Sequence, residues 1–203
     1  MASICAHIGR LPESQLAHER AQCANPQTRS GNLEWLHIFR ADFVRAEEKA
    51  ETWFHDRPDN FYALYTRILP PLSIGDLPLA QQRLEVALSR APGEPLFVSL
   101  QALLHAHRGE TDAALECVSR ALAWPRSLGH THHTYYQIAS VYAMLGDSDT
   151  AMAWLERSVN TGFACWPFFR VDPHLANLRE DPAFTRLVAD LERTYSAIEI
   201  ARV

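Results

Sequence analysis

The sequence predicts an all-α protein, a right-handed α-α superhelix of stacked helical hairpins that ends in C-terminal capping helices. The main observation is a period of 34 residues. Gly75 and Gly109 stand one period apart, and alanines follow both glycines at the same spacing: Ala80 with Ala114, and Ala87 with Ala121. The register extends back to Ala41 and forward, with three additional residues, to Gly146. A recurrence of this length is typical of stacked helical pairs.

Length, composition and charge narrow the class of protein. A chain of 203 residues that is 47% hydrophobic can bury a substantial core as one domain. The net charge is −5 and the basic residues are scattered, so nucleic acid is not an expected partner. No apolar run is long enough to span a membrane. The cysteines are widely separated, which predicts free thiols and a cytoplasmic location: Cys5, Cys23, Cys117 and Cys165.

The N-terminal part, residues 1–26, is interpreted as a helical extension or a degenerate repeat. A short helix is expected from Pro12 to Cys23, before Asn25-Pro26. Residues 27–165 form about three to four hairpins. The first of these, residues 27–60, fits the pattern least well, because Gly31 falls inside its first helix and Ala41 replaces the turn glycine. A single long helix over residues 32–55 is the competing interpretation.

The next three hairpins cover residues 61–94, 95–128 and 132–165. In the second hairpin of the array, Pro71 lies within the first helix and is expected to kink or shorten it. A longer connection is expected at residues 127–131, where the period stretches. The last hairpin is the clearest, because apolar residues recur at helical spacing before the turn Gly146-Asp147 and again after it: Tyr135, Ile138, Ala139, Tyr142, Ala151, Met152, Leu155 and Val159.

Acidic residues mark the predicted helix starts. One acid follows each turn and is expected to cap the second helix of its hairpin: Asp42, Asp76, Glu110 and Asp147. Residues 166–203 are expected to form closing helices that begin at Asp172-Pro173 and Asp181-Pro182, where proline at the first helical position loses no hydrogen bond.

These residues resemble the tetratricopeptide repeat, over roughly residues 27–165. The resemblance implies a protein or peptide partner on the concave face. The stretch from His132 to Leu191 also looks like the tail of bacterial signalling proteins in which such repeats follow a kinase, a nucleotide cyclase or a DNA-binding domain. A regulatory segment acting on such a partner is therefore an alternative function, and a self-association module, such as a homodimer, is another.

The positions that face the groove in this family are apolar and aromatic here. They predict a binding site for an amphipathic helix or an extended peptide at Trp35, Phe39, Tyr62, Tyr65, Leu69, Leu72, Leu103, His107, His133, Tyr136 and Met144. The lysine and asparagine of the family's carboxylate clamp are absent. The competing interpretation is that the protein's own terminal helices cover these side chains. Alanine at Tyr65 and Tyr136 is expected to weaken partner binding without unfolding the chain.

Catalysis, cofactors and metals are not expected. The sequence has no phosphate-binding glycine loop and no hydrolase or metalloprotease motif. Cys165 would need a histidine from elsewhere to act as a nucleophile. His130, His132 and His133 lie close together at a predicted helix start, but the sequence shows no further ligand that would complete a metal shell, so a polar helix start is the favoured interpretation.

Overall fold

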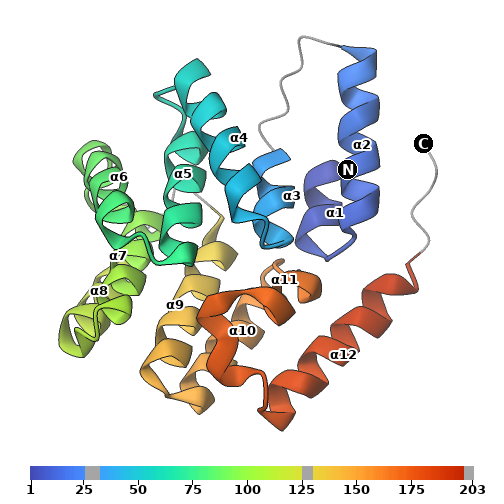
Figure 1. The fold of residues 1–203 in the computed structure, drawn as a ribbon. Helices are drawn as coiled ribbons and strands as arrows, with labels where there is room; N and C mark the ends of the chain where they lie inside the picture. The colour runs from blue at the N-terminus through green and yellow to red at the C-terminus, as the bar shows by residue number, and fades with distance from the viewer. Residues whose placement is uncertain (26–32, 125–129, 199–203) are drawn as a thin grey trace.

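The structure is a computed structural model that describes residues 1–25, 33–124 and 130–198, which are largely helical and contain no strand (Figure 1). The predicted all-α solenoid is confirmed. The chain begins with α1 (Ala2–His7) and α2 (Leu11–Ala24). Helical pairs follow: α3 (Leu33–Phe39) with α4 (Phe43–Asp56), α5 (Phe61–Ile74) with α6 (Leu77–Arg90), α7 (Pro95–His107) with α8 (Thr111–Ala123), and α9 (Thr131–Leu145) with α10 (Ser148–Asn160). It closes with α11 (Trp166–Val171), the 3-10 helix η1 (Pro173–Leu178) and α12 (Pro182–Ser196).

The first unit is a hairpin and not one long helix. Helix α3 ends at Phe39, and α4 begins at Phe43. The turn between them places Ala41 at a φ of 56°, the left-handed conformation that glycine adopts in the other turns. Alanine can therefore close this turn, but at a steric cost. The segment that contains Gly31 lies outside the described residues, as does most of the predicted connection at residues 127–131.

Most of the predicted helix caps are present. The carboxylates of Asp42, Asp76 and Asp147 accept hydrogen bonds from backbone N–H groups in the first turn of α4, α6 and α10. Asp172 and Asp181 cap η1 and α12 in the same way. Glu110 differs, because its longer side chain contacts the His105 imidazole at 2.5 Å and does not cap α8. A shared position therefore predicted the helix start in each case, and at Glu110 the contact with His105 replaces the cap.

The expectation that Pro71 kinks or shortens α5 is wrong as to the length, because the helix runs through Pro70 and Pro71 to Ile74. Pro71 has no N–H to donate to the Arg67 carbonyl one turn earlier. The buried Arg83 guanidinium, from α6, supplies the missing donor, with Nη1 2.6 Å from that oxygen. Arg83 also pairs with Glu47 and Glu51 of α4. One side chain therefore compensates the proline and joins α4, α5 and α6.

The two ends of the chain meet on the inner side of the solenoid. The backbone N–H of Ala164 donates to the His7 carbonyl at 2.7 Å, which ties the end of α1 to the segment before α11. Gly9 allows this approach, since a Cβ at that position would lie 2.6 Å from Pro167 Cδ. In Figure 1, α11 accordingly lies next to α1 and α3. No helix of the described residues is long and apolar enough to cross a membrane.

Glycine at the strained turn should stabilise the fold. The Ala41→Gly variant removes the steric cost of the left-handed conformation, which exceeds the entropy that glycine adds to the unfolded chain. We expect the free energy of unfolding, measured by urea titration, to rise by about 0.5–1 kcal/mol. Ala91→Gly is the control, because Ala91 has an ordinary φ of −143° and its replacement should destabilise. A loss of stability in Ala41→Gly would contradict the argument.

Removing the Arg83 guanidinium should destabilise the chain more than removing an exposed arginine of the same helix. Arg83→Ala leaves the Arg67 carbonyl and the Glu47 carboxylate without their donor, and we expect a loss of about 2–3 kcal/mol in urea titration. Arg90→Ala, which removes a half-exposed pair with Asp59, should cost less than about 1 kcal/mol. Equal losses in the two variants would contradict the proposed role of Arg83.

Candidate functional site

The residues of the predicted groove lie on α3, α5, α7 and α9, and the protein's own segments cover much of this surface. Six of the predicted groove residues are buried: Phe39, Tyr65, Leu72, Leu103, His133 and Tyr136. Five are partly exposed: Trp35, Tyr62, Leu69, His107 and Met144. The covering side chains come from α11 and the segment before α11. Phe163 and Phe168, for example, both lie against the Phe39 ring.

Tyr65 and Tyr136, the two residues chosen from the sequence for alanine substitution, already have partners within the chain. The Gln137 amide donates to the Tyr65 hydroxyl at 2.5 Å, and the Tyr136 hydroxyl donates to Asp172. The Tyr136 ring also stacks on the Phe169 ring, with 5.4 Å between the ring centroids. Alanine at these positions would therefore remove buried hydrogen bonds and core packing, so this pair of substitutions does not separate binding from stability.

A polar network lies within the covered face and centres on Asp172, whose side chain is 1% exposed. Its carboxylate accepts hydrogen bonds from Tyr136 and from the backbone N–H of His174, and it contacts His174 Nδ1 at 2.8 Å. The other ring nitrogen of His174 lies 3.0 Å from His107 Nε2. Burial alone would raise the pKa of Asp172, but the neighbouring His174 side chain and these hydrogen bonds outweigh it and hold the pKa below its ordinary value.

The hydrogen bonds of this network join η1 to α9, and its polar groups serve as hydrogen-bond partners for one another. A cavity of about 30 Å³ lies beside it, with room for about one water molecule. His107 is neutral at pH 7, because burial and then the neighbouring His174 lower its pKa to about 4.

Burial also raises the pKa of the Cys165 thiol to about 12, so this cysteine is not a thiolate at neutral pH.

An open pocket of about 240 Å³ remains where α1, α3, α5 and α9 meet. Two of the partly exposed groove residues, Trp35 and Tyr62, line it together with the buried His133. The Trp35 ring lies parallel to the His133 ring at a centroid distance of 5.0 Å, which fixes both side chains. The remaining lining comes from several elements: Ser3, Ala6, His7, His18, Phe39, Trp53, Asn60 and His130.

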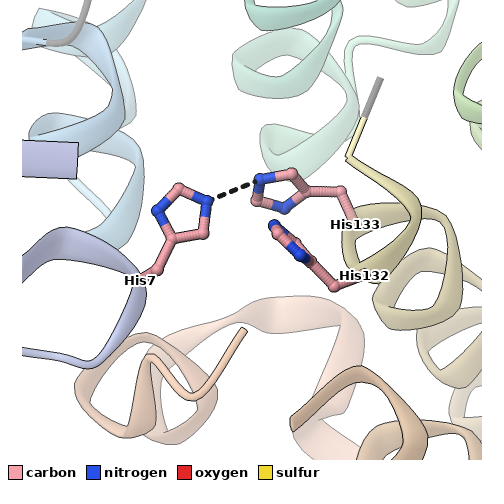
Figure 2. A group of neighbouring side chains, drawn as sticks. All are labelled: His7, His132 and His133. Carbon is pink, nitrogen blue, oxygen red and sulfur yellow. Dashed lines mark hydrogen bonds between the residues drawn. The ribbon is translucent and has the colours of Figure 1, made fainter. Parts of the chain in front are cut away.

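Four imidazoles cluster here: His7, His130 and His133, which line the pocket, and His132, whose ring contacts all three. Figure 2 shows the His7 ring of α1 facing the His133 ring of α9, with the His132 ring beside them. His7 Nε2 lies 3.1 Å from His133 Nε2. Burial is the main reason why the pKa values of His7, His132 and His133 are lowered, that of His132 to about 4. These three side chains are therefore neutral at pH 7.

Sequence reasoning found the three histidines at the start of α9 but missed His7. No spacing or motif relates residue 7 to residue 133, because their proximity depends on how α1 packs against the other helices. The one available signal in the sequence is Gly9, two residues after His7. It indicates a close approach of the backbone only when the structure shows that Gly9 lies next to Pro167.

Comparison with known proteins gives one family match. The model of the tetratricopeptide repeat matches residues 95–120 and 133–157, which correspond to α7–α8 and α9–α10. The match supports a tetratricopeptide-repeat family for these hairpins, as the sequence predicted. Repeats of this family generally mediate protein–protein interactions and are typically non-catalytic scaffolds. No match was found among curated proteins or among solved structures.

The buried Glu34 of α3 should make stability depend on pH. Its side chain has one carboxylate oxygen without a hydrogen-bond partner in the described structure, and burial raises its pKa from 4.5 to about 8. Between these two values the folded state holds a proton that the unfolded state has released, so the free energy of unfolding falls as pH rises. Glu34→Gln should remove this slope and stabilise the chain at pH 8 by about 2–4 kcal/mol.

Urea titrations at pH 5 and pH 8 measure the effect. The gain from Glu34→Gln should be small at pH 5 and large at pH 8, whereas Glu19→Gln, at an exposed position of α2, should change stability little at either pH. A gain from Glu34→Gln that is the same at both values would show that the Glu34 carboxyl does not titrate in this range.

Proposed function

We propose that this chain is a protein-interaction adaptor, and that the pocket between α1, α3, α5 and α9 receives a bulky aromatic or aliphatic side chain of a partner peptide. The proposed binding site is the part of the predicted groove that the protein's own segments leave exposed. The observation that carries it is the exposure of Trp35 and Tyr62 in a pocket of defined size, whereas the neighbouring Tyr65 and Tyr136 are buried.

The size and chemistry of the pocket support a peptide side chain as its occupant. Pockets for drug-sized molecules usually measure about 300–1,000 Å³, and this one is smaller, at about 240 Å³. Among the described residues, its lining contains aromatic rings, imidazoles, one amide, one serine hydroxyl and one alanine methyl group, and neither a lysine, an arginine nor a carboxylate. An uncharged, bulky side chain therefore fits it better than a charged one. Aromatic side chains at such positions often dominate the binding energy of an interface.

The match to the tetratricopeptide repeat supports the class of function, since repeats of this family generally bind proteins. The regulatory segment and the self-association module remain predictions from the sequence.

Selection from a peptide display library with the purified chain tests the proposal. We expect the selected peptides to share an aromatic or large aliphatic residue, and their affinity to fall at least about tenfold in Tyr62→Ala, as for an interface side chain worth more than about 1.4 kcal/mol. Ile74→Ala is the control, because Ile74 is 65% exposed on the same helix and lies outside the pocket. Peptides that bind both variants and the unmodified chain equally would place the binding site elsewhere.

A further inference from the structure

We propose that His7, His132 and His133 bind a divalent transition-metal ion, with Zn²⁺ as the reference ion. The described residues bring three imidazoles together, one from α1 and two from the first turn of α9, and their nearest ring nitrogens all lie within 4.8 Å of one another (Figure 2). The inference does not depend on a peptide partner, because all three ligands belong to this chain.

The hydrogen bonds of the rings present the correct nitrogens. His7 Nδ1 lies 2.7 Å from the Ser3 carbonyl, and His132 Nδ1 lies 3.2 Å from the Thr161 carbonyl. A carbonyl oxygen only accepts, so each Nδ1 carries the proton and each Nε2 keeps a free lone pair. A carbonyl that orients a metal-binding imidazole in this way is a common feature of metal sites.

One of these lone pairs has no partner. His132 Nε2 is buried and makes no hydrogen bond in the described structure. Burial of a polar atom without a partner costs free energy of folding, so such an atom calls for an explanation. His7 Nε2 and His133 Nε2 lie 3.1 Å apart, close to the separation of about 3.4 Å between two nitrogen ligands at 2.0–2.1 Å from a tetrahedral zinc ion. The third ligand nitrogen, from His132, lies within 4.8 Å of the other two.

The ligand set indicates the class of metal. Three neutral imidazoles suit zinc, copper, nickel or cobalt, whereas Mg²⁺ and Ca²⁺ require oxygen ligands. Three protein ligands leave a fourth position for water or another donor. His130 is the nearest further imidazole, with its ring centroid 5.0 Å from that of His132. Because His7 and His133 also line the open pocket, the fourth position lies beside that pocket.

Titration of Zn²⁺ into the tag-free, metal-depleted chain, in competition with a chromogenic chelator at pH 7.5, tests the site. We expect one Zn²⁺ per chain and no competition from Mg²⁺. His7→Gln and His132→Gln should each weaken Zn²⁺ binding by more than roughly tenfold, since even residues that only orient a ligand contribute about that much. His55→Gln should bind as the unmodified chain does, because this side chain is 91% exposed on α4.

Two further measurements keep the result interpretable. Circular dichroism checks that both variants are helical, and His132 is the more informative position because its Nε2 has no partner to lose. Co²⁺ bound to the unmodified chain should show the intense visible absorption of a four-coordinate ion. The absence of stoichiometric Zn²⁺ binding, a six-coordinate Co²⁺ spectrum, or equal Zn²⁺ affinity in His7→Gln and the unmodified chain would each overturn the proposal.

Discussion

The fold depends on the contact between aromatic side chains from both ends of the chain on the inner side of the solenoid. Phe39 of α3 packs against Phe163 and Phe168, and Tyr136 of α9 packs against Phe163, Phe168 and Phe169. Stacked hairpins leave one apolar face uncovered, and burial of that face is a large favourable contribution to folding. Here the chain supplies the covering residues itself, so the ends and the repeats form one core.

Covering the inner face with protein requires that its polar groups find partners there. Asp172 does so by accepting bonds from Tyr136 and His174, and Gln137 does so between Ser99 and Tyr65. Exceptions among the described residues include His132 Nε2 and one carboxylate oxygen of Glu34, which are buried without a hydrogen-bond partner. The same rule operates on the other side of α5, where the Arg83 guanidinium replaces the donor that proline lacks.

The repeat pattern predicted the hairpins because it depends on local residues. Each unit of about 34 residues contains all the required features. These are glycine or alanine at the turn, an acid after the turn, and apolar residues at helical spacing. The two incorrect or incomplete predictions depend on contacts between particular side chains, which the repeat pattern does not specify. Helix α5 continues through Pro71 because a residue of the next helix bonds the freed carbonyl, and Glu110 fails to cap α8 because His105 competes for its carboxylate.

The candidate site was less predictable for the same reason. The sequence placed Trp35, Tyr62, Tyr65 and Tyr136 on one face, yet it could not show which of them the chain's own segments would cover. Tyr65 and Tyr136 are covered by other parts of the chain, whereas Trp35 and Tyr62 stay partly exposed. His7 joins the other histidines only through the docking of α1, a contact between residues, His7 and His133, that are 126 positions apart in the sequence.

The hydrogen bond between the Ala164 N–H and the His7 carbonyl has a consequence for biosynthesis. Helices α1 to α9 leave the ribosome before the residues that cover their inner side, and synthesis proceeds at only about 5–20 residues per second. Each hairpin can form as it emerges, but Trp35 and Phe39 stay in water for several seconds until Phe163 and Phe168 follow. During that interval the nascent chain exposes an aromatic surface of the kind that chaperones bind, and completion of synthesis removes it.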